Sequence, residues 1–210
     1  MGAGEIAVTK STVSRTVDIE QALQKEFRTL SAANADLPML TEWGVESFSE
    51  RIHSLGINYL AQIGRRAGYV AVSEYPVSMA VPAPVPVSPC WVIPDVVWFD
   101  RTTRRVPLIG EFERYEPGGN KHQVLKEKVR NLLWAHRELG TEPRVLLLLL
   151  WTMSGNPVHG LDEFRSLVRT GFTTPGGAGI NGLEPESRFA IATAVFTTFE
   201  GCLRLKEILL

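Results

Sequence analysis

One segment limits the possible folds of this chain more than any other feature. Residues 144 to 152 read RVLLLLLWT, in which every position from Val145 to Trp151 is apolar. An apolar run without alternation indicates a strand that is covered on both faces, as in the interior of a sheet. Its seven residues are far fewer than the roughly 20 that cross a bilayer. The segment therefore predicts the central strand of a sheet with helices on both sides.

The flanking segments predict the other elements of this sheet. Apolar residues recur at helical spacing in two segments, 17–33 and 41–65, which predicts two helices. Strands are expected over residues 69–75, 91–99 and 106–113, followed by a basic helix over 121–139 and the apolar strand over 144–152. The order from residue 41 is therefore α-β-β-β-α-β. This order favours an α/β fold with a central mixed β-sheet flanked by helices.

The remaining segments indicate extensions of the same domain. Residues 81–89 contain four prolines, which predicts an extended segment outside the sheet. After residue 152 we expect a helix over 160–169, a glycine-rich loop, and a strand or buried helix over 188–199, with a short helix after it. The domain organisation that follows is an N-terminal extension with a short helix (1–40), a core (41–152) and a C-terminal extension packed on the same domain (153–210).

Composition excludes several classes of protein. The 210 residues include 22 Lys+Arg and 23 Asp+Glu, a net charge of −1, which excludes a uniformly basic nucleic-acid wrapper. Residues 101–144 nevertheless contain ten basic and six acidic residues. The two cysteines, Cys90 and Cys202, form no C-x-x-C pair, and the first ten residues lack the apolar stretch of a signal peptide. We expect a cytoplasmic protein without membrane segments.

Three acidic residues on two neighbouring predicted strands point to chemistry. Glu111 and Glu113 lie two positions apart, so their side chains leave the same face of a strand. Asp95 lies on the preceding strand of the predicted hairpin, within reach of both. Carboxylates that converge repel one another unless a cation neutralises them or one takes up a proton. Mg²⁺ binds oxygen ligands and needs few protein carboxylates, so these three residues are candidate magnesium ligands.

A simpler interpretation of E-x-E is the solvated face of an edge strand. The surroundings of these residues favour a shared site instead. VPLI precedes the Glu111 position, and Asp95 lies within VIPDVVWF, so both carboxylate positions have apolar neighbours. A separation of more than about 8 Å between Asp95 and Glu111 would be too large for one shared ion, given its ligand distances. In that case the chain would be an unrelated α/β protein.

The pattern Pro94-Asp95 followed by Glu111-Phe112-Glu113, within an α-β-β-β-α-β succession, resembles the PD-(D/E)xK nuclease superfamily, which has the restriction-endonuclease-like fold. The resemblance covers roughly residues 41–152. It implies that Asp95 and Glu111 bind Mg²⁺ (or Mn²⁺) and that a lysine at the third motif position assists the attacking water. It also implies a nucleic-acid substrate, DNA rather than RNA, and a dimer would suit cleavage of both strands.

This sequence departs from that motif at its third position, which is Glu113 rather than lysine. Some restriction endonucleases of this fold also carry E-x-E, and other members of the superfamily move the lysine to the following helix. Lys121 and Lys128 lie seven residues apart on one flank of that predicted helix, so either one can extend toward the carboxylates. The alternative is that both are solvated helix charges. The candidate catalytic residues are therefore Asp95, Glu111 and Glu113, with Lys121 or Lys128.

Further candidates come from the first core helix and from the basic segment. Nucleases of this fold often add an acidic ligand from the first helix, here Glu46 or Glu50; the alternative is a charged helix face near its N-terminus. The hairpin between the second and third strands is basic and is a candidate phosphate-backbone contact. The candidate nucleic-acid-binding residues are Arg101, Arg104, Arg105, Arg114, His122 and Lys126. Arg114 is expected on the opposite face from Glu113, remote from the metal.

Two functions remain open from the sequence. The first is a Mg²⁺-dependent endonuclease or exonuclease in which a metal-activated water hydrolyses a phosphodiester bond. The second is a catalytically inactive module of the same fold that binds DNA or protein within a larger bacterial or phage system, which the missing motif lysine favours. A lysine that points into the acidic cluster would distinguish the first function from the second.

Overall fold

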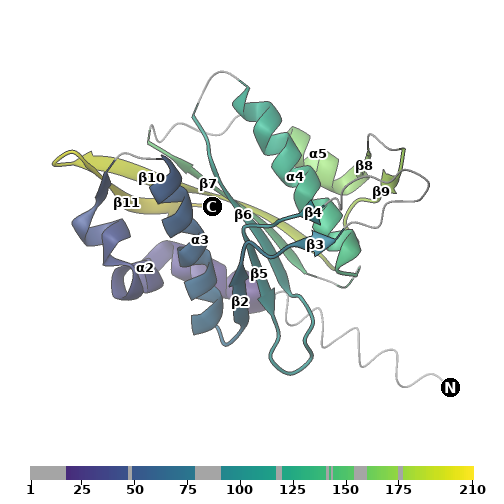
Figure 1. Ribbon diagram of the computed structural model, residues 1–210, viewed down its shortest axis with the longest axis horizontal. Coiled ribbons are helices and arrows are strands. Elements are labelled where there is room, and N and C mark those ends of the chain that lie inside the picture. The colour runs from purple at the N-terminus through teal and green to yellow at the C-terminus, as the bar shows by residue number, and fades with distance from the viewer. Residues whose placement is uncertain are drawn as a thin grey trace.

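The computed structural model describes residues 18–46, 49–78, 91–116, 120–140, 142, 144–153, 160–174 and 177–210. These residues form a curled, seven-stranded mixed sheet with helices on both faces (Figure 1), in the strand order β1-β11-β10-β7-β6-β5-β2. The strands of this sheet are β1 (Val45–Glu46), β2 (Val70–Ser73), β5 (Val96–Phe99), β6 (Leu108–Arg114), β7 (Val145–Thr152), β10 (Arg188–Phe199) and β11 (Cys202–Leu209). The chain is therefore a mixed α/β protein.

The predicted central strand is β7, and all eight of its residues are buried. β6 and β10 flank β7, and both run parallel to it. The three strands β2, β5 and β6 form an antiparallel meander at one side of the sheet. The predicted hairpin is thus confirmed, and its turn lies at the bottom of Figure 1. The helix α4 (Lys121–Glu138) then connects β6 to β7.

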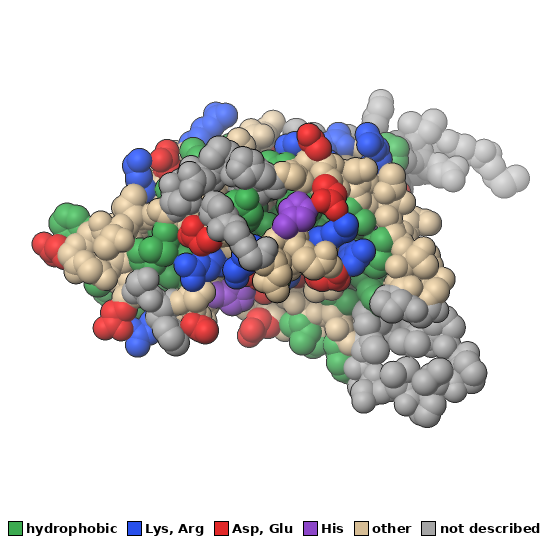
Figure 2. Space-filling model, turned by 90° about the horizontal axis from the view of Figure 1, so that it is seen from above, with side chains coloured by type: hydrophobic (Ala, Val, Ile, Leu, Met, Phe, Trp, Pro, Cys, Tyr) green, Lys and Arg blue, Asp and Glu red, His purple; other side chains and the backbone are tan. Residues whose placement is uncertain are grey.

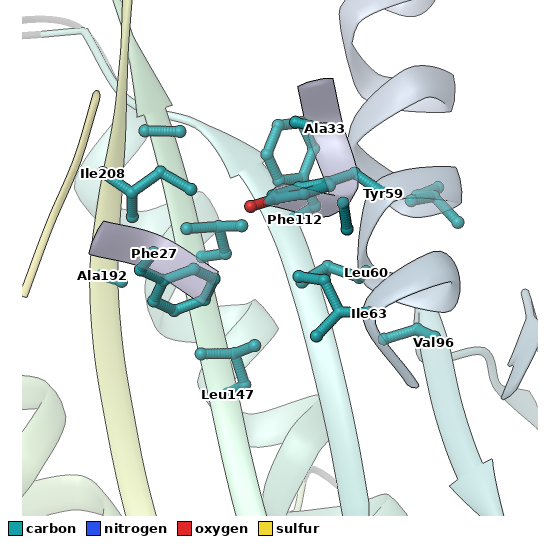
Figure 3. Close-up of a cluster of buried hydrophobic side chains, with 14 of the residues drawn as sticks. Phe27, Ala33, Tyr59, Leu60, Ile63, Val96, Phe112, Leu147, Ala192 and Ile208 are labelled. Atoms are coloured by element: carbon teal, nitrogen blue, oxygen red, sulfur yellow. The ribbon is translucent and has the colours of Figure 1, made fainter. Parts of the chain in front are cut away.

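One face of the sheet is covered by α3 (Ser49–Arg66) and by a helix over residues 18–29. Figure 3 shows the core between them, where side chains from helices and strands interdigitate. Gly56 and Gly64 allow the backbone of α3 to approach the sheet closely. A Cβ atom at Gly56 would lie 2.0 Å from the Phe112 ring, and one at Gly64 would lie 2.6 Å from the Trp98 ring. Burial of these large rings against the helix backbone holds α3 beside β5 and β6.

The opposite face of the sheet is covered by α4 and α5 (Leu161–Thr170), and each contributes to a second hydrophobic core. The side chains of α4 that face the sheet are Leu125, Val129, Leu132 and Leu133, which are fully buried. They pack with apolar residues of β6 and β7, among them Ile109 and Leu148. The spacing of these residues places them on one face of the helix. The alternating residues of β6 therefore face two separate cores.

The helix expected from residue 41 begins instead at Ser49. Residues 39–43 form a wide helical turn, η1 (Met39–Trp43). Gly44 follows with φ of +80°, a conformation that glycine adopts without strain. Val45 and Glu46 then pair with Leu203 and Cys202 as β1. The apolar spacing across this segment was therefore produced by three elements rather than one helix. A separate short helix, α2 (Ser31–Asp36), spans the end of the helix expected over 17–33 and continues beyond it.

The C-terminal segment completes the sheet. Residues 188–199, expected as a strand or buried helix, form β10, while the expected short helix after it is wrong, because residues 202–209 form β11. β11 pairs antiparallel with β10 over most of its length. Phe27 of the N-terminal helix and Ile208 of β11 lie in the same core (Figure 3). The first and last segments thus share one core with the residues between them.

The smaller elements are two ribbons, β3 (Val77–Ser78) with β4 (Trp91–Val92), and β8 (Phe172–Thr173) with β9 (Gly179–Ile180). The strand expected over 91–99 is thus divided in two at Pro94. The proline-rich segment 81–89, the first 17 residues and Cys90 lie outside the described residues. Within the described part of the chain, no helix has both the length and the apolar character of a membrane span.

Candidate active site

The candidate site lies where β5 and β6 separate. The last residue pair between these strands is Val96 with Gly110, after which β6 continues to Arg114. Asp95 immediately precedes β5, and its Oδ2 atom accepts a hydrogen bond from the backbone N–H of Phe112 at 2.7 Å. The carboxylate thereby replaces a strand carbonyl as the acceptor. This bond holds Asp95, which is 5% exposed, beside the two glutamates of β6.

Glu111 and Glu113 leave β6 on the face that α4 covers. Glu111 is fully buried, because the second hydrophobic core surrounds this part of the strand. Its Oε1 atom is buried and has no hydrogen-bond partner among the described residues. Glu113 is two residues nearer the end of the strand, and its side chain is 18% exposed. Glu111 therefore lies in the interior, and Glu113 lies nearer the solvent on the same face of β6.

Lys128 of α4 extends into this acidic group. Its Nζ atom lies 2.8 Å from Oε2 of Glu111, 3.8 Å from Oδ1 of Asp95 and 3.8 Å from Oε2 of Glu113. Because the three carboxylates share one nitrogen atom within 4 Å, Asp95 and Glu111 lie closer than the separation that excludes a shared ion. We refer to Asp95, Glu111, Glu113 and Lys128 as the carboxylate–lysine cluster.

The electrostatics of the cluster follow from burial and mutual repulsion. Burial raises the pKa of the Glu111 carboxyl well above its usual value, and the charge of Asp95 raises this pKa further, whereas Lys128 opposes the rise. Burial alone would lower the pKa of the Lys128 ammonium, but the charges of Glu111 and Asp95 outweigh burial, and the pKa is raised. Lys128 is therefore charged at neutral pH. The carboxylates still favour an additional cation or a proton at Glu111.

The structure adds His53 of α3 to the site. Its Nε2 atom lies 3.7 Å from Oδ1 of Asp95, on which the Lys128 ammonium also acts. Its ring lies 6.2 Å from the Phe112 ring, centroid to centroid. The sequence prediction gave His53 no role. In the sequence, His53 lies three residues before Gly56, the helix position against which Phe112 packs. This position gave no direct signal, because the contact between His53 and Asp95 depends on how α3 packs on the sheet.

A cavity of about 420 Å³ opens beside the cluster. It lies between the first turns of α3 and the ends of β6 and β7, and Ser49, Glu50, His53, Ser54, Glu113, Arg114 and Trp151 line it. Figure 2 shows acidic, basic and histidine side chains together on the upper face of the molecule. The cavity connects the partly exposed Glu113 carboxylate with the solvent. A molecule bound there would contact Glu113, the one cluster residue that lines the cavity.

The two lysines predicted as alternatives are separated by the structure. Lys121 is the first residue of α4, two helical turns or about 10 Å along the axis from Lys128. No contact between Lys121 and the three carboxylates is present, and Lys128 is the one that reaches them. The seven-residue spacing correctly placed both lysines on one flank of the helix. Only the point at which α4 crosses β6 selects between them.

Glu46 and Glu50, predicted as additional metal ligands, have different positions. Glu46 lies on β1 rather than on the first core helix, is exposed, and forms an ion pair with Arg51. It is therefore separate from the cluster. Glu50 is in the first turn of α3 and lines the cavity together with Glu113. The expectation that one helix carries both residues was wrong because Val45 and Glu46 pair with β11, and α3 begins only at Ser49.

The predicted nucleic-acid-binding arginines fall into two groups. Arg101, Arg104 and Arg105 lie in the turn before β6, at the opposite end of this strand from Glu113. Arg101 donates a hydrogen bond to the Gly68 carbonyl at 3.0 Å, and Arg105 forms an ion pair with Glu142 at 3.2 Å. From Leu108 to Glu113 the strand rises by about 17 Å. These arginines therefore do not line the candidate site.

Arg114, expected on the opposite face from Glu113, contacts Trp151 in the core beneath α3. Its guanidinium lies over the Trp151 ring, 5.1 Å from the centroid, and lines the cavity with Glu113. By contrast, His122 and Lys126 both contact Glu163 of α5, at 2.6 Å and 2.5 Å. These two contacts connect α4 with α5.

The carboxylate oxygens of the cluster suit a hard divalent cation by their chemistry, but their arrangement is not that of a metal-binding cluster. The available ligands are carboxylate oxygens, which Mg²⁺ and Mn²⁺ prefer, and Glu111 Oε1 is a buried acceptor with no partner among the described residues. However, within the described ranges no group of three His, Cys, Asp or Glu side chains has the arrangement of a metal-binding cluster. The Lys128 ammonium lies among the carboxylates and supplies the positive charge there.

Comparison of the chain with protein-family models, with curated proteins and with solved structures gives no match.

Proposed function

We propose that this protein is a metal-dependent nuclease that hydrolyses phosphodiester bonds, with DNA as its substrate. The observation that carries the proposal is Lys128, which extends from α4 to within 4 Å of three carboxylates at the fork of β5 and β6. A buried carboxylate pair beside a lysine is costly to fold. Such an arrangement is typical of catalytic sites, where groups with shifted pKa values gather.

The arrangement of elements around the cluster supports the same proposal. Helix α3, the antiparallel strands β2, β5 and β6, helix α4 and the parallel strand β7 occur in this order along the chain, with the ribbon of β3 and β4 between β2 and β5. This order is compatible with the α-β-β-β-α-β succession of the PD-(D/E)xK nucleases that the sequence resembles. Asp95 lies before β5 and Glu111 lies on β6, in the order of that motif.

Each residue of the cluster has a distinct role in this proposal. Asp95 and Glu111 would hold the cation, which would stabilise charge on the phosphate and lower the pKa of the attacking water. Glu113, the most exposed of the three carboxylates, adds a ligand or accepts the proton that the water loses. Lys128 donates a hydrogen bond to a phosphate oxygen and offsets the charge that develops as the phosphorus–oxygen bond breaks.

One observation favours a second function. Because Lys128 already forms an ion pair with Glu111 at 2.8 Å, the cluster is partly neutralised without any divalent ion. A catalytically inactive module that binds DNA or protein could retain such an ion pair as a structural contact. In that case the chain would bind no divalent ion at the cluster.

A cleavage assay on plasmid and single-stranded DNA with Mg²⁺, Mn²⁺ or EDTA tests the proposal, with Glu111→Ala measured in parallel. We expect cleavage that requires the metal and is absent in the variant. Calorimetric titration with Mn²⁺ supplies the second measurement. Absence of both cleavage and metal binding in the folded wild-type protein would favour the inactive binding module.

A further inference from the structure

The cavity beside the cluster contains an arginine whose charge has no carboxylate partner within the described part of the chain. Arg114 lies over the Trp151 ring, and one of its guanidinium nitrogens lies 4.0 Å from the Met153 sulfur. Its Nε atom is buried without a hydrogen-bond partner among the described residues. The contact with Trp151 fixes the plane of the guanidinium at the cavity wall. Its donor atoms are therefore positioned before any ligand binds.

Several other arginines in the described part of the chain differ from Arg114 in this respect. Arg66, Arg105 and Arg130, for example, each form an ion pair with an aspartate or glutamate. Arg204 is the closest match to Arg114, because it lies over the Phe199 ring at 4.1 Å and also has a buried Nε atom without a partner. Arg204 is on β11 and does not line the cavity. It therefore provides a matched control.

The charges in the cavity determine when an anion can bind. Two carboxylates, Glu50 and Glu113, line it together with Arg114 and His53. An anion beside Glu113 would be repelled unless the charge of the nearby cluster were neutralised. The Lys128 ammonium, 3.8 Å from Glu113, neutralises part of this charge. A divalent cation at the cluster would neutralise more, so anion binding at Arg114 is expected to depend on that cation.

The dimensions of the cavity limit its occupant. A volume of about 420 Å³ is within the range of about 300–1,000 Å³ in which proteins bind small molecules. One nucleotide fits such a cavity, but a base-paired duplex does not enter it without unpairing. The wall includes two hydroxyl groups, of Ser49 and Ser54, and the partly exposed His53 ring. These groups offer hydrogen bonds and a flat surface to a sugar and base.

We infer that this cavity binds one unpaired nucleotide of the substrate, with Arg114 bound to its phosphate group next to the carboxylate–lysine cluster. The inference rests on the proposed nuclease function and extends it to the substrate class. The enzyme then acts on single-stranded DNA or on unpaired ends in preference to a continuous duplex. Arg114 acts as a binding residue for the phosphate beside the one that is cleaved.

Binding of thymidine 5′-monophosphate tests this inference, because the molecule is a single nucleotide without a phosphodiester bond to cleave. Its affinity is measured by calorimetry with and without Mg²⁺, with thymidine as the control that lacks the phosphate. We expect Mg²⁺-dependent binding of the monophosphate and none of thymidine. Arg114→Met should weaken binding about tenfold or more, since a charged hydrogen bond is lost, while Arg204→Met should leave it within about twofold of the wild type.

A second variant distinguishes loss of nucleotide binding from loss of folding. Ser54 is exposed and lines the cavity, so Ser54→Trp fills the space without removing Arg114. We expect this variant to keep the wild-type melting temperature and Mn²⁺ affinity and to lose monophosphate binding. Equal monophosphate binding by wild type, Arg114→Met and Ser54→Trp would overturn the inference, as would no binding to a wild type that binds Mg²⁺.

Cleavage of matched single-stranded and duplex oligonucleotides separates this inference from the proposed function. If the wild type cleaves both equally in Mg²⁺, the nuclease proposal holds and the inference about unpaired nucleotides is wrong. If the wild type cleaves neither, the nuclease proposal is wrong, whereas binding of the monophosphate through Arg114 remains measurable. A preference for the single strand that is lost in Ser54→Trp supports both.

Discussion

Two buried glutamates of this protein have opposite surroundings. Glu26, in the helix over residues 18–29, is 6% exposed and accepts hydrogen bonds from the Tyr59 hydroxyl at 2.9 Å, the Ser31 hydroxyl at 2.6 Å and the Ala32 N–H at 2.9 Å. Both of its oxygens are therefore satisfied by neutral donors. The interaction joins this helix to α2 and α3. A buried polar group with complete hydrogen bonding stabilises a fold.

Glu111, in contrast, is fully buried with one oxygen bound to Lys128 and the other without a partner in the described structure. Its immediate neighbours include two further carboxylates rather than neutral donors. The Glu26 arrangement is complete without a ligand, whereas the Glu111 arrangement has an acceptor available for one. Burial alone thus does not distinguish a carboxylate whose acceptors the protein satisfies from one that keeps an acceptor available. Glu26 and Glu111 differ in how many of their oxygen atoms accept hydrogen bonds from the protein itself.

The largest expected effect is on activity. Glu111→Gln keeps the size of the side chain but removes the charge that would hold a cation. We expect cleavage to fall by about a thousandfold or more, comparable to the loss of one strong electrostatic contact in a catalytic site. The melting temperature should stay close to that of the wild type, because Gln keeps an oxygen acceptor for the Lys128 ammonium. Retained cleavage at more than about a tenth of the wild-type rate would remove Glu111 from the mechanism.

Lys128 is expected to contribute less than the carboxylates. Lys128→Met retains much of the apolar stem and removes the ammonium, so cleavage should fall about a hundredfold while Mn²⁺ still binds in calorimetry. Lys126→Met is the control on the same helix, since Lys126 contacts Glu163 of α5. Its cleavage rate should remain within about threefold of the wild type. Equal effects of the two substitutions would show that Lys128 has no specific role.

Glu26 should affect stability rather than chemistry. Glu26→Met removes the acceptor for Tyr59, Ser31 and Ala32 and leaves buried donors unsatisfied, which should lower the free energy of unfolding by about 2–3 kcal/mol. Gln24→Met, at an exposed position of the same helix, should change it by less than about 0.5 kcal/mol. Urea unfolding measures both values. Loss of cleavage by folded Glu26→Met, with an unchanged free energy of unfolding, would contradict the structural role of this residue.

The smallest expected effect is a dependence on pH. Burial and Asp95 raise the pKa of Glu111, so the folded protein retains a proton that the unfolded chain has lost above about pH 4.5. The contribution of this group to stability is therefore present at low pH and is lost as the pH rises through the raised pKa. In the proposed function, a divalent ion would replace that proton. The increase in melting temperature on adding Mn²⁺ should be greater at pH 8 than at pH 6, and Glu111→Gln should abolish the difference.

Several features were predictable because they depend on local periodicity. The apolar run of β7, the hairpin of β5 and β6, and the basic helix α4 all follow from the spacing of apolar residues. The shared face of Glu111 and Glu113 follows from the two-residue period of a strand. The approach of Asp95 follows from the hairpin. These predictions needed no knowledge of how the helices pack.

The predictions that failed depended on strand pairing that the local pattern does not show. Val45 and Glu46 belong to β1 because they pair with residues more than 150 positions later. The chain after residue 201 is a strand because β10 offers it an edge. At β1, pairing with a distant strand overrides a local helical pattern, since the added strand satisfies backbone groups and buries apolar side chains. β10 and β11 instead form a local hairpin, joined by Glu200 and Gly201, which both have positive φ.

The sequence by itself therefore determined the central apolar strand, the α-β-β-β-α-β order and three carboxylates on adjacent strands. Only the tertiary structure decided that Lys128 rather than Lys121 reaches them, that His53 and Arg114 lie beside them, and that Glu46 does not. The physical reason is that a helix or strand sets the spacing of its own side chains, whereas a contact between elements depends on where they cross. That crossing is determined by the packing of Phe112 against Gly56 and of the α4 leucines against the sheet.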